Sequence, residues 1–166
     1  MSWARGMSQS GFMFISMKSI PHTAGRPELA LKTLFLDFDG VLHGMSQTSA
    51  RPFERIYLLE PLVDVAPFAI VVSSSWRFHF ELSEIRQRLG RLNPLVVGTT
   101  GEAIVGRNAR HREILSYVQH HQINDWRALD DAYLEFPDDA AGLVLCNPRT
   151  GVTEREVRIL RDWLIN

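Results

Sequence analysis

The sequence has a single cysteine, Cys146, among its 166 residues, so no disulfide framework can form within the chain. Cys146 closes the apolar run 142–146, where a small buried hydrophobe is favoured over a reactive thiol. Domains that mature in oxidising compartments often depend on disulfides. We therefore expect a reducing environment, the cytoplasm.

Long apolar runs are also missing, because none approaches the roughly 20 residues needed to cross a bilayer. No membrane partner is expected. Residues 1–27 are rich in Ser, Gly and Met but have neither the long apolar centre nor the cleavage site of a secretory signal. We interpret residues 1–30 as a flexible leader and residues 31–166 as one globular domain. Met7, Met13 and Met17 are alternative translation starts.

Charge of one sign is not in excess, since 18 basic residues face 19 acidic ones and the formal net charge is -1. Nothing in this balance favours a general nucleic-acid-binding surface that neutralises many phosphates, so any contact with nucleic acid would be local. With 45% hydrophobic and 22% charged residues, the composition is that of a globular protein with a buried core.

Short apolar runs alternate with stretches of helical period, a pattern typical of a parallel sheet with helices on both faces. Helix signals include a capping-box spacing between Thr153 and Glu156 and a stop at Gly90. We predict a three-layer, Rossmann-like α/β fold. The expected strands are 34–38, 68–72, 95–97, 126–129 and 142–146, and the expected helices are 52–67, 82–89, one around 114–118, and 153–164.

Two carboxylates, Asp37 and Asp39, directly follow the first apolar run. The carboxyl ends of strands form the ligand crevice of an open α/β sheet. Two carboxylates this close repel unless a cation offsets them, so the pair indicates either a hard ion such as Mg²⁺ or one raised pKa. A solvated Asp-Gly turn is the alternative interpretation.

Polar residues follow two other predicted strands. Ser73 and Ser74 come after the second, where hydroxyls and backbone N–H groups at a strand-to-helix junction can cradle a phosphate. Asp130 and Asp131 follow the fourth. Two acidic pairs at two strand ends would be unfavourable without a metal ion, so together they favour a functional site.

In this order, the motifs resemble the haloacid dehalogenase (HAD) superfamily of phosphohydrolases. That pattern is an Asp-x-Asp-Gly, then Ser or Thr, then a basic residue at a helix start, then an acidic pair. Three segments, residues 72–77, 110–114 and 128–131, more narrowly resemble a small capless branch found in RNA-repair (Swiss Army Knife) proteins. The basic residue is one of Arg107, Arg110 and Arg112, and we select Arg110 because it precedes the apolar face of the predicted helix.

The resemblance implies a Mg²⁺-dependent phosphatase in which Asp37 is the nucleophile and Asp39 the general acid and base. It further implies that Mg²⁺ is held by Asp37, the backbone carbonyl of Asp39 and one or both of Asp130 and Asp131. Ser73, Ser74 and the basic residue would bind the phosphate. The family usually has Lys where we select Arg110, and many members carry Thr at the position of Val41.

Neither interval between the motifs is long enough for a cap domain: 30 residues separate Leu42 from Ser73, and 32 separate Arg77 from Arg110. We expect an open crevice, with Arg51, Trp76 and Arg77 at its rim, that admits a phosphorylated substrate as large as a nucleic-acid end. His43 is expected to have a structural role. Two alternatives stay open, a noncatalytic phosphate-binding adaptor of an RNA-repair system and, less favoured, a receiver domain of a signalling relay.

Overall fold

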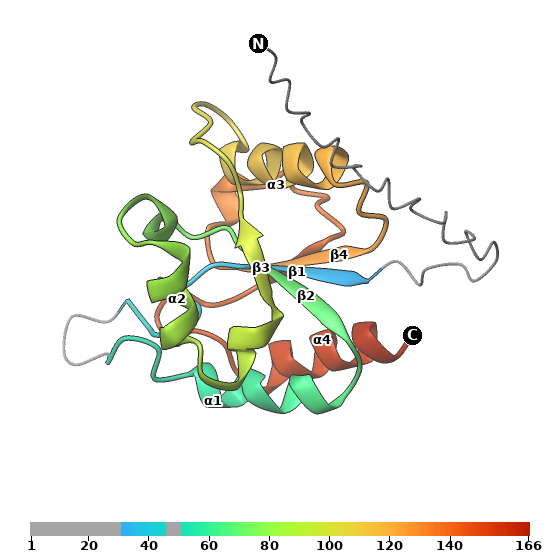
Figure 1. Ribbon diagram of the computed structural model, residues 1–166. Helices are drawn as coiled ribbons and strands as arrows, with labels where there is room; N and C mark the ends of the chain where they lie inside the picture. Colours follow the sequence, from blue (N-terminus) through green and yellow to red (C-terminus); the bar gives the residue numbers. More distant parts are fainter. Residues whose placement is uncertain (1–30, 46–50) are drawn as a thin grey trace, which may run out of the picture.

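A five-stranded parallel sheet forms the centre of the computed structural model, which describes residues 31–45 and 51–166 (Figure 1). The predicted leader 1–30 lies outside the described residues. The strand order is β3-β2-β1-β4-β5, which places β1 in the middle. The strands are β1 (Lys32–Leu36), β2 (Phe68–Val72), β3 (Val96–Thr99), β4 (Trp126–Asp130) and β5 (Leu143–Leu145).

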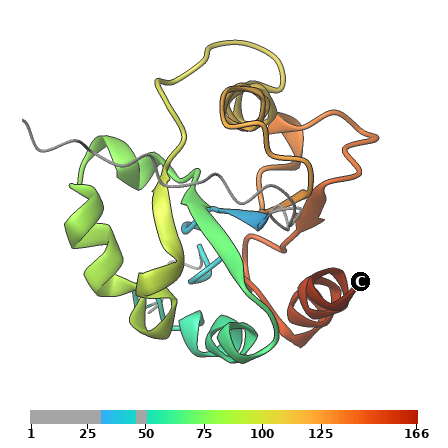
Figure 2. The same ribbon diagram turned by 45° about the vertical axis from the view of Figure 1, so that its right-hand side comes forward.

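Helices cover both faces of this sheet (Figures 1 and 2). One face packs against α3, and the other packs against α1, α2 and α4, which confirms the predicted three-layer α/β fold. The helices are α1 (Ile56–Leu59), α2 (Leu82–Arg88), α3 (Ala109–His120) and α4 (Glu154–Ile165). The 3-10 turns are η1 (Glu60–Asp64), η2 (Ser75–Phe78), η3 (Gly90–Leu95) and η4 (Tyr133–Glu135).

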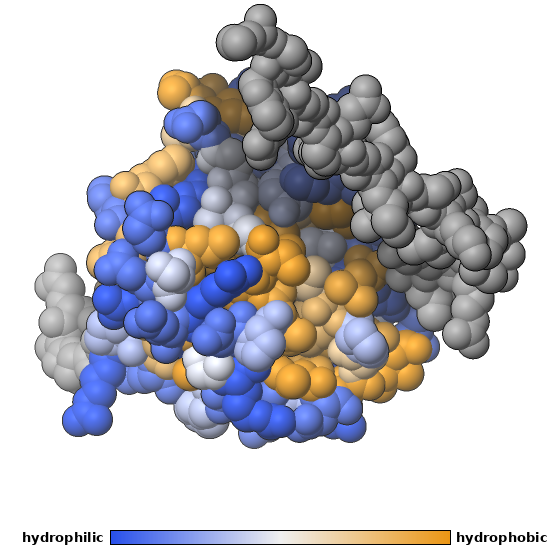
Figure 3. All heavy atoms as spheres, in the orientation of Figure 1, coloured by the Kyte–Doolittle hydropathy of each residue, from blue (hydrophilic) through white to orange (hydrophobic). Residues whose placement is uncertain are grey.

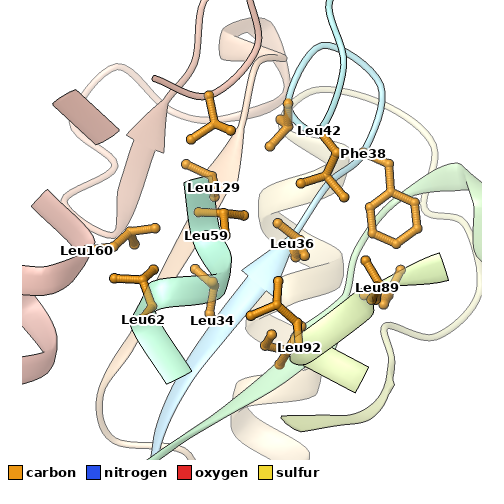
Figure 4. Packing of buried hydrophobic residues seen from close by; sticks show 14 of the residues in the cluster. Leu34, Leu36, Phe38, Leu42, Leu59, Leu62, Leu89, Leu92, Leu129 and Leu160 are labelled. Carbon is orange, nitrogen blue, oxygen red and sulfur yellow. The ribbon is translucent and has the colours of Figure 1, made fainter. Parts of the chain in front are cut away.

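The side chains of β1 point alternately to the two faces of the sheet, and the hydrophobic core is accordingly divided into two clusters. Leu34 and Leu36 point into the larger apolar cluster beneath α1, α2 and α4 (Figure 4), whereas Phe35 points into the smaller cluster beneath α3. All three side chains are at most 1% exposed. Because successive side chains of a strand point to opposite faces, an unbroken apolar run is needed when both faces are covered.

The helix predicted over residues 52–67 is shorter than expected. Only Ile56–Leu59 is α-helical, and the chain continues as the 3-10 turn Glu60–Asp64. Pro61 explains the change, because it has no backbone N–H to donate and cannot extend an α-helix through its own position. By contrast, the capping box predicted for Thr153 and Glu156 is present at the start of α4.

Neither of the two intervals contains a cap domain within the described residues. The connection from β1 to β2 contains α1 and η1, and the connection from β2 to β3 contains η2, α2 and η3. No described helix is long and apolar enough to span a membrane. Figure 3 shows the face of the molecule on which the edge strand β3 lies in front. Hydrophobic residues gather near the centre of this face, and Val97 of β3 is exposed.

Candidate active site

Asp37 lies at the first position after the central strand, where three strand ends meet. Its backbone N–H donates to Leu129 O at 3.1 Å, and the N–H of Ser73 donates to Leu36 O at 3.0 Å. These bonds continue the ladders of β1 with β4 and β2 past the strand ends. The residues that follow β1, β2 and β4 are thereby held on one edge of the sheet, as expected for parallel strands.

An acidic cluster forms at this edge. Asp37, Asp130 and Asp131 each place a carboxylate oxygen within 4.8 Å of the others. Gly40 makes room for the cluster: its φ is +70°, and a Cβ there would lie 2.2 Å from Asp131 Oδ2. Only glycine combines that left-handed backbone with such a close approach.

Arg110 joins the cluster from the first turn of α3. Its Nη1 donates to Asp130 Oδ2 at 2.9 Å and lies 3.3 Å from Asp37 Oδ1. Arg107 and Arg112 are exposed, and Arg112 Nη1 donates instead to the carbonyl of Val105. Among the three basic residues considered from the sequence, the structure thus brings Arg110 to the cluster.

One guanidinium does not balance three carboxylates. Burial first, and then the charge of Asp37, raises the pKa of Asp130 to about 7. The same two causes raise the pKa of Asp131 to about 6. The cluster therefore has excess negative charge and closely spaced oxygens, a donor set that fits Mg²⁺, because this ion binds carboxylate oxygens and offsets their repulsion.

Asp39 is not one of the three clustered carboxylates, and its side chain is 44% exposed. The indole Nε1–H of Trp76 donates to Asp39 Oδ2 at 3.0 Å, and His43 Nε2 lies 3.0 Å from Asp39 Oδ1. The carboxylate is thus held on both oxygens while one side stays open to solvent. That is the arrangement a general acid needs, since proton transfer depends first on geometry.

Buried hydroxyls lie at the ends of β2 and β3. Ser73 Oγ has no hydrogen-bond partner among the described residues, and the same holds for Oγ1 of Thr100, which directly follows β3. A buried hydroxyl without a partner is costly, so a ligand that satisfies it is favoured. Ser74 differs: it is buried, and its Oγ caps η2 by accepting from the N–H of Trp76.

Arg77, which the sequence predicts at the rim of the site, has its side chain held by buried partners. Its side chain is 3% exposed and forms an ion pair with the buried Glu113, with Nη2 2.7 Å from Glu113 Oε2. Its other nitrogens donate to the carbonyls of Ser73, Ser74 and Gly101. The guanidinium thus fastens the ends of β2 and β3 to α3, the helix that carries Arg110. Because its N–H groups donate to these partners, Arg77 stabilises the loops and the helix that form the site.

The two other residues predicted for the rim differ from each other. Trp76 is half-buried, stacked on Phe80 and packed edge-on against Phe53 and Phe38, so its contact with Asp39 comes from a packed side chain. Arg51 is exposed, and no ion pair links it to the cluster within the part of the chain that the structure describes.

A family model described as the HAD domain in Swiss Army Knife RNA repair proteins matches residues 33–157, which is most of the chain. The chain belongs to this family. No curated protein and no solved structure gives a significant match. The matched segment of this HAD domain includes Asp37, Asp39, Ser73, Arg110 and the pair at 130–131, so the residues gathered at the sheet edge all lie within it.

Sequence reasoning missed several residues of the HAD domain that support the site. Glu113, Thr100 and the contact of Trp76 with Asp39 were not predicted. Glu113 lies three residues after Arg110 on α3, a spacing that places both on one helix face, so helical period could have indicated it. Trp76 carried no comparable signal, because an aromatic residue after a strand is usually a core residue.

Proposed function

We propose that this HAD domain is a Mg²⁺-dependent phosphomonoester hydrolase that works through an aspartyl-phosphate on Asp37. One observation carries the proposal: a nucleophile-like carboxylate shares its site with Arg110 and two further carboxylates, while Asp39 is held separately and half-exposed. A structural acidic cluster would not need the second, separately held carboxylate.

In the first step, a carboxylate oxygen of Asp37 attacks the phosphorus and the bond to the leaving oxygen breaks. Asp39 gives its proton to that oxygen, so the alcohol leaves neutral. In the second step, Asp39 takes a proton from water, whose oxygen attacks the same phosphorus. The bond between Asp37 and phosphorus then breaks, which releases inorganic phosphate, restores the carboxylate of Asp37 and leaves Asp39 protonated for the next cycle.

The remaining residues position the phosphate. Mg²⁺ held by Asp37, the backbone carbonyl of Asp39 and one or both of Asp130 and Asp131 would offset the charge of the carboxylates and the phosphate. Arg110, which lies beside Asp37, would bind a phosphoryl oxygen and hold the phosphate against the nucleophile, and the unpartnered hydroxyl of Ser73 would donate to another. Electrostatic positioning of this kind is most of what phosphoryl transfer requires from a protein.

The absence of a cap within the described residues and the exposure of Asp39 support a bulky substrate, such as a phosphorylated nucleic-acid end. The family takes its name from RNA repair proteins, which supports the same substrate class. The single cysteine of the chain, Cys146, is buried and forms no disulfide, which suits the reducing cytoplasm where we expect the enzyme to act.

Hydrolysis of p-nitrophenyl phosphate with and without Mg²⁺ tests the proposal. We expect turnover that requires the metal ion and is lost in Asp37→Asn, a variant that keeps the volume of the side chain. A protein that binds a phosphorylated oligonucleotide but shows no turnover at any Mg²⁺ concentration would instead be a noncatalytic adaptor. Higher kcat/KM for small sugar phosphates than for 3'-phosphorylated oligonucleotides would contradict the proposed substrate size.

A further inference from the structure

A pocket opens beside the acidic cluster at the carboxyl ends of β4 and β5. Its volume is about 570 Å³, and Asp131 lines it as well as belonging to the cluster. The rest of its lining comes from Ala132 and η4, from the end of β5 and the residues that follow it, and from Arg155 in the first turn of α4. The pocket therefore adjoins the place where the phosphate of a substrate would lie.

Unusual exposure of apolar side chains characterises this pocket. Tyr133 is 63% exposed, Leu134 72% and Leu145 43%, although all three are large hydrophobic residues. The side chain of Arg155, 77% exposed and 3.3 Å from Glu156 Oε1, and the amide of Asn147 add polar groups to the lining, and Asp131 and Glu135 add two carboxylates. An exposed aromatic ring and aliphatic side chains beside a cation and an amide suit a flat, polar-edged, partly charged ligand better than an acyl chain.

We propose that this pocket binds the base of the nucleotide whose phosphate is hydrolysed, and that the substrate is therefore the phosphorylated end of a single-stranded nucleic acid. This inference rests on the proposed phosphatase function. Tyr133 would stack on the base, since aromatic stacking is the common way to hold an unpaired base and tolerates any sequence. Arg155 would contact the phosphodiester on the other side of the same nucleotide.

The geometry of the pocket supports this assignment. A volume in the range of about 300–1,000 Å³ is usual for sites that hold a small molecule, and a nucleoside belongs to that size class. Asp131 belongs both to the acidic cluster and to the lining of the pocket, so a base in the pocket would lie next to the phosphate of the same nucleotide. A sugar phosphate would leave the pocket empty and expose its apolar lining to water.

The test compares two 3'-phosphorylated oligonucleotides that differ only in the terminal nucleotide, which carries a base in one and is abasic in the other. We expect wild-type kcat/KM to favour the substrate with the base by about tenfold or more, as stacking predicts. Tyr133→Ala should reduce that ratio to less than about threefold, and Tyr133→Phe should retain it because the ring remains. Tyr57→Ala, at an equally exposed tyrosine of α1, is the matched control and should keep the wild-type ratio.

Turnover of p-nitrophenyl phosphate by the same preparations separates the two proposals. If the wild type lacks this turnover, the phosphatase function fails, and the base pocket fails with it. If the turnover is present but the base and abasic substrates react equally, or Tyr133→Ala keeps the wild-type ratio, the pocket assignment is overturned and the phosphatase stands. A hydrophobic aryl phosphate that gains as much from Tyr133 as the base does would also overturn the assignment to nucleic acid.

Discussion

The indole N–H of Trp76 donates to Asp39 Oδ2 at 3.0 Å, although the two residues are 37 positions apart in the sequence. The ring itself is held by stacking on Phe80 and by edge contacts with Phe53. A packed ring cannot rotate freely, so the hydrogen bond fixes the direction in which the Asp39 carboxylate points. Trp76 is therefore a positioning residue for the proposed acid.

Trp76→Phe should separate substrates by their leaving groups. The variant keeps an aromatic ring in the same contacts but loses the N–H donor to Asp39. A positioned acid contributes about 10²–10⁴-fold to rate, and chiefly when the leaving oxygen is basic. We expect the ratio of kcat/KM for an alkyl phosphate to that for p-nitrophenyl phosphate to fall at least about tenfold. An equal loss for both substrates would indicate a purely structural role.

Arg110 should be essential, and its neighbour Arg112 should not. Arg110→Gln removes the cation that contacts Asp37 and Asp130, and loss of one such electrostatic contact costs about 10²–10³-fold in rate. Arg110→Lys, which restores the residue usual in the superfamily, should retain most activity. Arg112→Gln is the control, since that side chain is exposed and bonded to a loop carbonyl. Steady-state kcat/KM values for the three variants check the prediction, and similar losses for Gln at positions 110 and 112 would contradict it.

The metal-free protein should lose stability as the pH rises from 5 to 8. Burial and the charge of Asp37 raise the pKa of Asp130 to about 7, above the ordinary value of about 3.8. Between these values the folded state binds more protons than the unfolded state, so the free energy of unfolding falls as pH increases. Asp130→Asn removes this group, while others such as His111 still titrate in both proteins.

Thermal unfolding of wild type and Asp130→Asn at several pH values measures this effect. We expect the difference in free energy of unfolding to shift against the wild type as pH rises, and Mg²⁺ to stabilise the wild type more at pH 8 than at pH 5 because it binds the ionised carboxylates. Parallel pH profiles for the two proteins would contradict the raised pKa.

Gly40→Ala should damage the metal site and the fold together. The new Cβ would meet Asp131 Oδ2, and the residue would have to hold a φ of +70°, which costs an L residue about 1–2 kcal/mol. We expect a lower melting temperature and at least about tenfold weaker Mg²⁺ binding by calorimetric titration, because a displaced Asp131 no longer completes the cluster. Gly101→Ala is the matched control, since a Cβ there has nothing within 4 Å. Unchanged Mg²⁺ affinity in Gly40→Ala would place the metal away from Asp131.

The layers of the fold were predictable from sequence because burial on two faces requires continuous apolar runs, as in residues 68–72. The positions of polar residues at the ends of the predicted strands also indicated which of them lie together, since parallel strands bring Asp37, Ser73 and Asp130 to one edge of the sheet. Contacts made by side chains from distant loops were not predictable. The ion pair of Arg77 with Glu113 is an example, because the two residues are 36 positions apart and neither carries a sequence signal of the pairing.

Trapping the covalent intermediate tests the role of Asp37 most directly. Borohydride converts an aspartyl-phosphate to homoserine, so mass spectrometry of acid-quenched, reduced protein identifies the residue that carried the phosphoryl group. With Mg²⁺ and p-nitrophenyl phosphate we expect homoserine at position 37 in the wild type and none in Asp37→Asn. The fraction should be larger in Asp39→Asn, where loss of the base slows hydrolysis of the intermediate. Turnover with residue 37 unmodified in both the wild type and Asp39→Asn, or with the phosphoryl group on another residue, would contradict Asp37 as the nucleophile.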